Sequence, residues 1–311
     1  MLLSVIVAAY NAEKYIQECM ESILTQIDAN VEVIVINDGS KDSTLDILEK
    51  MNREYSFVLL NQENRGVAYT RNRGLKVARG DYITFLDSDD VWENNSYALI
   101  KKTAKNNSDC LVFNYKEWTP NDLKIKIAML PNSLSIEQSK ITLAEQSLWY
   151  LWRMVFKREI YQGIFFEEGR RFEDQLILPK LINRCQTVLI SNDSLVKYRF
   201  NTDSITNSLN SNDVIDSFYC LDKYIEEYRN RINNLYYSKV ISNIYISHIS
   251  KCARVYHTDK KIALKFFRGG NKIFRLKIAY YAQNKKALAY YMFRYFLFYR
   301  LVKSVKKEVN L

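Results

Sequence analysis

Apolar and polar positions follow two different patterns along the first third of the chain. Short runs rich in β-branched residues occupy 2–9, 31–36, 57–60 and 81–86. Between them, residues 12–25, 43–51 and 67–79 carry apolar side chains at helical spacing, and Gly80 is placed to end the last of these helices. Strands that alternate with helices of this length are typical of βαβ units. The pattern therefore predicts an α/β fold with a parallel sheet.

The later sequence predicts one more strand and then a helical region. Residues 109–115 form another apolar run, and residues 135–138 (SIEQ) have the spacing of a capping box at the start of a helix. From Val214 onward the spacing is helical, with little glycine and no proline. We expect three parts: residues 1–105, residues 106–210, which complete the α/β fold, and a mostly helical region over 211–311.

Composition separates a basic tail from the rest of the chain. Among 311 residues 48% are apolar, which is enough for a globular core. The net charge is +10, yet residues 251–311 hold 16 Lys and Arg against only Asp259 and Glu308, so the remainder is slightly acidic. Five scattered cysteines and two histidines disfavour disulfide and zinc frameworks and indicate a reducing, cytoplasmic compartment. The apolar start lacks a basic flank and a cleavage site, so we expect a strand rather than a signal peptide.

Three carboxylates follow directly after the apolar run at 81–86, namely Asp87, Asp89 and Asp90. Open α/β sheets bind ligands at the carboxyl ends of their strands. In a strand, Asp87 and Asp89 would share a face, and two carboxylates so close repel each other unless a cation lies beside them. A Mg²⁺ or Mn²⁺ ion, with substrate phosphates completing its ligands, would remove that repulsion. The alternative is an acidic turn that caps the next helix.

Asp38 and Arg71 are expected near this cluster, because the loops after parallel strands gather at one edge of the sheet. Asp38, directly before Gly39, is suited to accept a hydrogen bond from a base or ribose. Arg71 is suited to stack on a base or to neutralise a phosphate. Each also has a plainer interpretation, since Asp-Gly-Ser is an ordinary turn and Arg71 belongs to a series of cations typical of solvated surface.

Four blocks together resemble the family 2 glycosyltransferases: SVIVAAYN at 4–11, VIVINDGSKDST at 33–44, NRG at 64–66 with RNRG at 71–74, and FLDSDD at 85–90. The resemblance implies the GT-A fold, a nucleotide-sugar donor, a divalent metal and inversion at the anomeric carbon. It also implies a role for each matching residue. Ala8 and Tyr10 would border the nucleotide, Asp38 and Arg71 would contact the base, Asp87 the ribose and Asp89 the metal.

A tryptophan-rich block at 148–159, followed by Glu173 and Asp174, resembles the acceptor half of the bacterial members that build polysaccharides. The resemblance makes Asp174 the catalytic base, with Glu173 positioning it or the acceptor. The chemistry needs such a group, because an acceptor hydroxyl must lose its proton as it attacks the anomeric carbon. The alternative is an acidic pair favoured by the dipole at a helix N-terminus. Pro179 is expected to kink or restart that helix.

Three further residues are candidates for the acceptor site. Trp149 and Trp152 would share one face of a helix and could stack on an acceptor sugar, although core packing is the commoner fate of tryptophan. Arg199, with the sequence SIT at 204–206 after it, resembles a late element of these enzymes that reaches the phosphates.

The basic tail carries 12 aromatic residues between 266 and 299, and the stretch 288–302 is too short and too charged to span a membrane. Basic, aromatic-rich amphipathic helices lie in the membrane interface. The alternatives are a helical subdomain with a solvated basic face and, with less support because no nucleic-acid motif accompanies the charge, RNA binding.

These observations lead us to expect a metal-dependent, inverting glycosyltransferase. It would move a hexose or N-acetylhexosamine from a UDP-sugar to a hydroxyl of a lipid-linked (undecaprenyl-diphosphate) saccharide, in O-antigen or capsule synthesis. It would be peripheral on the cytoplasmic face of the cell membrane, with an anionic lipid surface and no nucleic acid as partner.

Two rival functions remain open. The first is a polyprenyl-phosphate sugar synthase, whose acceptor phosphate needs no base and which usually carries spanning helices. The second is a non-catalytic protein that binds nucleotide sugars or nucleic acid. The combination of Asp87, Asp89 and Asp174 argues against the second.

Overall fold

A computed structural model of the chain describes residues 1–119, 122–126, 135–147, 149–199, 209–231 and 233–309. Contacts within the chain group it into two compact units: Met1–Ser139 with Trp149–Asn201, and Lys140–Leu148 with Thr202–Leu311. The expected helical region 211–311 lies within the second unit. The expected boundary at residue 105 stays a prediction.

The first unit is built on one mixed sheet with the strand order β3-β2-β1-β4-β8-β6-β9-β5, in which β7 pairs with β6. The strands are β1 (Leu3–Ala9), β2 (Val31–Asp38), β3 (Val58–Gln62), β4 (Tyr82–Asp87), β5 (Val91–Trp92), β6 (Cys110–Thr119), β7 (Asp122–Lys126), β8 (Met154–Lys157) and β9 (Val188–Arg199). β1 is parallel to β2 and β4, and β2 is parallel to β3, which confirms the expected parallel α/β core. β8 is antiparallel to both β4 and β6, which the sequence pattern did not predict.

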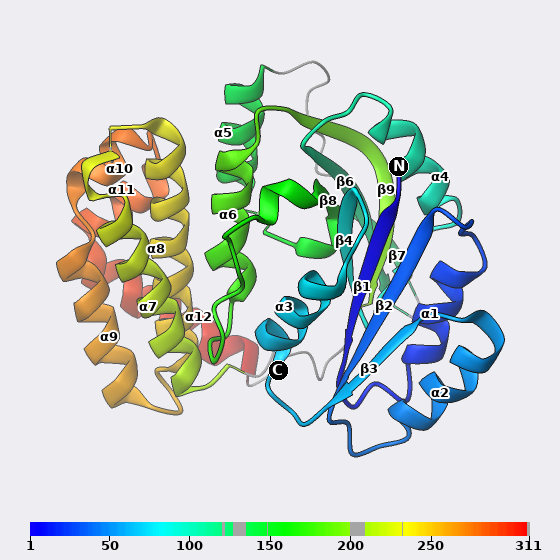
Figure 1. The fold of residues 1–311 in the computed structure, drawn as a ribbon. Helices are drawn as coiled ribbons and strands as arrows, with labels where there is room; N and C mark the ends of the chain where they lie inside the picture. Colours follow the sequence, from blue (N-terminus) through cyan, green and yellow to red (C-terminus); the bar gives the residue numbers. More distant parts are fainter. Residues whose placement is uncertain (120–121, 127–134, 148, 200–208, 232, 310–311) are drawn as a thin grey trace. The chain divides into compact units, whose positions relative to one another are not determined.

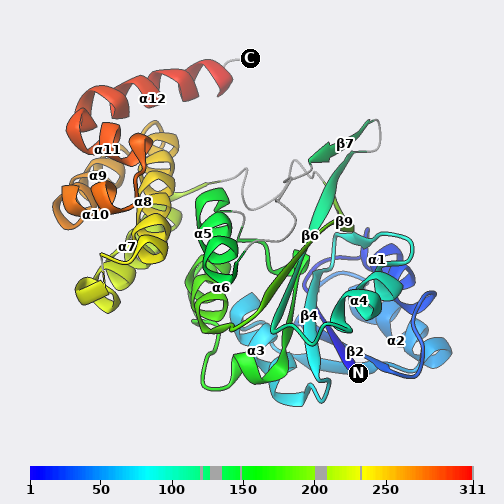
Figure 2. The ribbon, with the colours of Figure 1, turned by 90° about the horizontal axis from the view of Figure 1, so that it is seen from above.

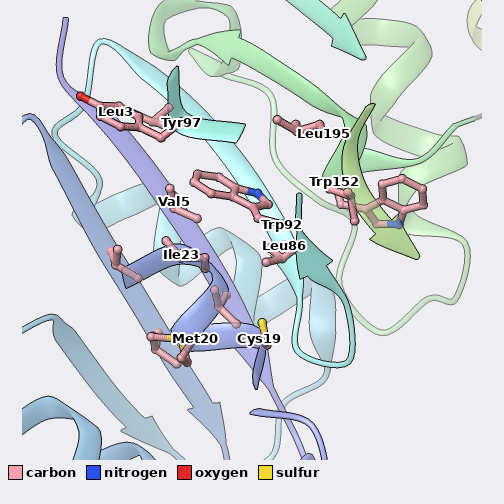
Figure 3. Packing of buried hydrophobic residues seen from close by; sticks show 14 of the residues in the cluster. Leu3, Val5, Cys19, Met20, Ile23, Leu86, Trp92, Tyr97, Trp152 and Leu195 are labelled. Carbon is pink, nitrogen blue, oxygen red and sulfur yellow. The ribbon is translucent and has the colours of Figure 1, made fainter. Parts of the chain in front are cut away.

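Helices cover both faces of this sheet. α3 (Val67–Val77) and α6 (Glu173–Arg184) lie on one face, and α1 (Ile16–Leu24), α2 (Thr44–Tyr55) and α4 (Ser96–Ala104) lie on the other (Figures 1 and 2). Side chains alternate along β1, so Val5 joins the apolar cluster that contains Met20 of α1 (Figure 3). Ile6 points to the opposite face, where a Cβ added at Gly74 of α3 would lie 2.5 Å from its Cγ2. Only glycine permits this close approach.

The expected capping box is confirmed at the start of α5 (Ile136–Gln146). The Ser135 N–H donates to Gln138 Oε1, and the Gln138 N–H donates to Ser135 Oγ. These two bonds satisfy donors that the first turn of a helix otherwise leaves free.

The described part of the second unit is helical, as its sequence periodicity predicts. It contains α7 (Ser211–Glu227), α8 (Leu235–Val255), α9 (Lys260–Ile273), α10 (Leu276–Tyr281), α11 (Lys285–Met292) and α12 (Arg294–Val309). α8 packs against all five of the others. Stacked aromatic pairs hold this core together, with ring centroids 3.9 Å apart for Tyr245 and Phe274 and 4.0 Å apart for Phe267 and Phe298.

The strand alternation expected to reach Asp89 is wrong, and of the two outcomes expected at Pro179, a kink or a restart of the helix, the restart does not occur. β4 ends at Asp87 and the chain turns at Ser88 and Asp89, so strand alternation does not decide where the Asp89 side chain points. α6 is a single helix from Glu173 to Arg184 that includes Pro179, so the helix does not restart there. A proline in a helix removes one backbone hydrogen bond, and this helix, buried along much of its length, tolerates that loss. Among the described residues, no helix has the length and apolar character needed to cross a membrane.

Candidate active site

The carboxyl ends of β1, β2 and β4 bring the expected nucleotide-binding residues to one edge of the sheet. Ala8 and Asp87 lie side by side in register on β1 and β4. The loops after β1 and β2 are joined, because the Asn11 N–H donates to Ser40 Oγ at 3.0 Å. Tyr10, in the loop after β1, is 47% exposed, so its ring is open to a ligand.

Arg71 is the centre of a charge cluster at this edge. It lies on α3, is only 4% exposed, and is paired with three carboxylates. Its Nη1 lies 2.5 Å from Glu173 Oε1 and 2.9 Å from Asp174 Oδ1, and its Nη2 lies 2.8 Å from Asp87 Oδ1. A guanidinium suits this position because its planar fork can donate in several directions at once. Arg71 is therefore not solvated surface, and its expected contact with a base stays a prediction.

The Asp174 carboxylate has the electrostatic character that a general base needs. Burial raises the pKa of Asp174 to about 7; Arg71 lowers this pKa, while Glu173 and Asp87 raise it. Its side chain keeps 21% exposure, so a substrate hydroxyl can reach it. A base is most effective when its pKa lies near the working pH.

The pair also occupies the first turn of α6, as the helix-dipole interpretation predicts. Phe172, directly before it, has a φ of 64°. This left-handed conformation is rare for a bulky residue, and strain of this kind gathers at functional sites. Asp174 thus lies both at the N-terminus of a helix and in the cluster around Arg71. Burial nevertheless raises its pKa well above that of an ordinary aspartate.

Asp89 and Asp90 follow Asp87 in the turn after β4. Burial, and then the charge of Asp87, raises the pKa of Asp89 to about 6. Burial also raises the pKa of Asp90 well above the ordinary value of an aspartate, and its Oδ2 has no hydrogen-bond partner among the described residues. In this turn, burial and the neighbouring carboxylates therefore both disfavour the charged form of Asp89 and Asp90.

The donor set of this turn fits a hard divalent cation. A cation beside Asp89 would offset the repulsion that raises its pKa. Within the described ranges, no group of three His, Cys, Asp or Glu residues could hold a metal by itself. Asp89 would thus supply one carboxylate, and phosphates and water would supply the other ligands, as is usual for Mg²⁺.

Arg199, at the end of β9, is bound to the same turn. Its Nε donates to the Asp89 carbonyl at 2.9 Å, and its backbone N–H donates to Asp90 Oδ1 at 2.8 Å. The guanidinium lies 4.9 Å from the ring centroid of Tyr15 and 4.1 Å from that of Trp118. Sequence reasoning chose Arg199 for the acceptor or the phosphates; its contacts here fix the acidic turn, and the SIT motif at 204–206 lies outside the described residues.

Comparison with known proteins identifies the family. The family model for Glycosyl transferase family 2 matches residues 4–167. The chain belongs to glycosyl transferase family 2. The glycosyltransferase GlyG of Streptococcus pneumoniae serotype 4 is 31% identical over 218 residues, which cover 66% of this chain and 72% of GlyG. The chain spans between 31% and 72% of the length of the three curated relatives that head the comparison.

Two further comparisons concern a solved structure and a shorter match. S. aureus TarS 1–349 in complex with UDP-GlcNAc has a TM-score of 0.73 at 20% identity, covering 99% of this chain and 92% of that one. This likeness establishes the GT-A fold of the glycosyltransferase. The UDP-Glc:alpha-D-GlcNAc-diphosphoundecaprenol beta-1,3-glucosyltransferase WfaP of Escherichia coli is 44% identical over 91 residues, which cover 29% of this chain and 36% of WfaP.

Asp38 of this glycosyltransferase holds the loop that leads into α3. The carboxylate is 3% exposed, with Oδ1 accepting from Gln62 Nε2 at 2.7 Å and from the Arg65 N–H at 2.8 Å. Its Oδ2 accepts from the Gly66 N–H at 2.9 Å. Asp38 therefore joins the end of β2 to the loop between β3 and α3, and its expected contact with a base stays a prediction.

The structure corrects the assignment of the two tryptophans to a helix face. Trp149 precedes a short 3₁₀ turn at Leu151–Arg153, and Trp152 lies within it. Both rings are buried, at 4% and 3% exposure, so neither is placed to stack on a sugar. Trp152 instead stacks on Tyr150, with ring centroids 5.1 Å apart, and Tyr150 is 38% exposed. Tyr150, which sequence reasoning did not single out, keeps part of its ring exposed in this block.

Proposed function

We propose that the protein is an inverting glycosyltransferase that transfers a hexose or N-acetylhexosamine from a UDP-sugar to a hydroxyl group of a lipid-linked saccharide. The observation that carries the proposal is the cluster around Arg71, which joins Asp87 on the donor side to the partly exposed Asp174. Family membership supplies the reaction class. The cluster around Arg71 contains the residues to which we assign this reaction.

In this proposal Asp174 accepts the proton of the acceptor hydroxyl. As that proton leaves, the hydroxyl oxygen attacks the anomeric carbon from the side opposite the nucleotide, and the bond from that carbon to the departing UDP breaks. A single displacement of this kind inverts the anomeric centre. Arg71 pairs with both Glu173 and Asp174 and so holds the Asp174 carboxylate in place, and the Leu151 nitrogen lies 3.4 Å from its Oδ2.

The donor would bind along the edge formed by Ala8, Tyr10, Asp38 and Asp87. Asp89 would hold a Mn²⁺ or Mg²⁺ ion, which when bound neutralises the charge that develops on the leaving diphosphate. The expected ribose contact of Asp87 is consistent with its 37% side-chain exposure at the end of β4.

Two comparisons support the choice of substrates. TarS forms a complex with UDP-GlcNAc, and the name of WfaP specifies a UDP-sugar donor and a saccharide joined to diphosphoundecaprenol. We therefore propose undecaprenyl-diphosphate saccharides as the acceptor class and the assembly of O-antigen or capsular polysaccharide as the process. Such an acceptor would place the enzyme at the inner face of the cell membrane.

The proposal is tested with Asp174→Asn, which keeps the side-chain volume but removes the base. General-base catalysis contributes roughly 10² to 10⁴ in rate, so turnover should fall by about a hundredfold or more while the dissociation constant of the UDP-sugar stays unchanged. Transfer to a lipid-linked acceptor and calorimetric donor binding measure the two quantities on the same protein.

Asp46→Asn is the matched control, because Asp46 is an exposed aspartate in the first turn of α2. If Asp174 served only the helix dipole, both variants would lose at most about 1 kcal/mol of stability and little activity. Turnover of Asp174→Asn close to that of the wild type would refute the base assignment.

A further inference from the structure

The C-terminal helices expose a group of large apolar side chains that the core of their unit does not use. Of these, Tyr280 is 72% exposed, Met292 61%, Phe293 59% and Phe296 68%. Tyr295 and Tyr299, at 48% and 41%, extend the group along α12. Isolated surface apolar residues are ordinary, but this many exposed large apolar side chains within three successive helices indicate an interaction surface.

The opposite side of α12 is firmly packed, so the exposure is not a consequence of a loose helix. Phe298 is fully buried against Phe267, and Val302, one turn later, is 5% exposed. Phe296, Arg300 and Lys303 follow at helical spacing on the outer side, and all three are exposed. α12 therefore has an inner apolar side and an outer side that combines aromatic and basic residues.

The charges around the group all have one sign. Lys285 and Lys286, at the start of α11, are exposed, as are Arg300 and Lys303 of α12. The sequence contains no Asp or Glu between Asp259 and Glu308. The outer face is thus a set of apolar and aromatic side chains within a field of positive charge.

From this geometry we propose that the face formed by Tyr280, Met292, Phe293, Phe296, Tyr299 and the four cations Lys285, Lys286, Arg300 and Lys303 docks on an anionic lipid surface. The inference deepens the proposed function, since a lipid-linked acceptor is presented at such a surface. The apolar side chains enter the boundary between headgroups and acyl chains, and the cations pair with anionic headgroups. Tyrosine suits this position because its ring is apolar and its hydroxyl is polar.

A second copy of the chain fits this face less well. Two such faces would bring like charges together with no acidic side chain in this stretch to compensate, and lysine is depleted at the centres of protein interfaces. Nucleic acid would satisfy the charge, but it offers no apolar phase for Met292 and Phe293. Anionic lipid is the one partner of the three that satisfies both the charge and the apolar groups.

The test is co-sedimentation of the full chain with vesicles of phosphatidylcholine alone or of an equimolar mixture of phosphatidylcholine and phosphatidylglycerol. The wild type should bind the mixed vesicles, bind the neutral ones at least about tenfold more weakly, and lose binding as salt rises. An apolar variant and a charge variant should each weaken binding to mixed vesicles by about tenfold or more. The apolar variant combines Met292→Gln, Phe293→Gln and Phe296→Gln. The charge variant combines Lys285→Gln, Lys286→Gln, Arg300→Gln and Lys303→Gln.

The matched control removes the same number of charges from α9 of the same unit. Its four positions, all exposed, are Lys261→Gln, Lys265→Gln, Arg268→Gln and Lys272→Gln. This control should retain most of the binding, and all variants should keep the melting temperature of the wild type because the substituted side chains are exposed.

Three outcomes would overturn the proposal. The first is equal weakening by the α9 control and the charge variant, which means attraction by overall charge without a defined face. The second is a concentration-dependent dimer of the wild type that the apolar variant abolishes, with vesicle binding unchanged. The third is tighter binding of an RNA oligonucleotide than of mixed vesicles, lost in the same variants.

A direct probe reports insertion itself. Phe296→Trp should show a blue-shifted emission with mixed vesicles and quenching by brominated acyl chains, whereas emission unchanged by vesicles would contradict insertion. Vesicle binding needs neither donor nor acceptor, so its failure leaves transfer to a soluble acceptor unaffected. Conversely, loss of transfer in Asp174→Asn leaves vesicle binding unaffected.

Discussion

Replacing Arg71 by Met removes a cation that pairs with three carboxylates. Arg71 is 4% exposed, and its partners Glu173 and Asp174 keep only 13% and 21% of their side-chain exposure. Breaking a buried ion pair from one side typically costs roughly 3–5 kcal/mol. Because the Asp87 side chain is 37% exposed, water screens its ion pair with Arg71. We therefore expect the free energy of unfolding to fall by about 3 kcal/mol at neutral pH, near the lower end of this range.

The loss should depend on pH in a defined direction. Arg71 lowers the pKa of Asp174, so without it the folded variant holds protons to a higher pH than the folded wild type. The unfolded chain releases those protons near the ordinary aspartate pKa of about 4. From about pH 4 to about pH 6 Asp174 is protonated in both folded proteins, so their stabilities change in parallel with pH. Above the wild-type pKa of about 7 only the folded variant keeps this proton, so its loss of stability relative to the wild type should grow from about pH 7 to about pH 9. The acid limb of kcat should move to higher pH for the same reason.

Urea denaturation of the variant across this pH range measures the effect, with Arg73→Met as the matched control. Arg73 lies on the same helix but donates to the Asn61 carbonyl and to Gln62 Oε1, so its removal leaves no carboxylate unpaired. The stability of Arg71→Lys should lie between those of the wild type and Arg71→Met, because one ammonium group cannot pair with three carboxylates as well as a planar guanidinium can. Equal losses for Arg71→Met and Arg73→Met, or a loss constant across the pH range, would refute the reasoning.

Two further predictions concern the donor side. Asp89→Asn should weaken UDP binding in the presence of Mn²⁺, because an amide is a poorer ligand for a hard cation; calorimetry checks this, and wild-type affinity unchanged by EDTA would contradict the metal assignment. Asp38→Asn should lower stability by about 2 kcal/mol, because an amide N–H₂ at the place of Oδ2 would face the Gly66 N–H without an acceptor. Urea denaturation beside Asp46→Asn measures the second effect, and an unchanged midpoint would mean that Asp38 does not hold the loop.

The parallel core was predictable because its signals are local. Buried runs and helical spacing lie within single segments, so the observed strands β1 to β4 begin or end within about two residues of the expected ones. The capping box at Ser135 was predictable for the same reason, since both of its partners lie within one turn. Local patterns of this kind do not depend on what packs against them.

The prediction that Trp149 and Trp152 share a helix face was wrong because a continuous apolar run has no periodicity that separates helix from strand. In the structure this segment contains a 3₁₀ turn at Leu151–Arg153 and then the strand β8. The burial of Trp152 follows from strands β6 and β9, whose Tyr115 and Tyr198 contact its ring. No pattern within the block itself specifies those partners.

The cluster around Arg71 lies beyond any local pattern, since its partners are 16, 102 and 103 positions away in the sequence. The excess of acidic over basic groups in this cluster is nevertheless what suits it to the proposed chemistry. One guanidinium pairs with three acids, and burial, together with the negative charges of Glu173 and Asp87, raises the pKa of Asp174. A second cation here would lower that pKa and make the carboxylate a weaker base. With no cation, the acid would keep its proton at neutral pH. A single buried arginine gives the intermediate case, in which Asp174 is held in position and still has a pKa of about 7.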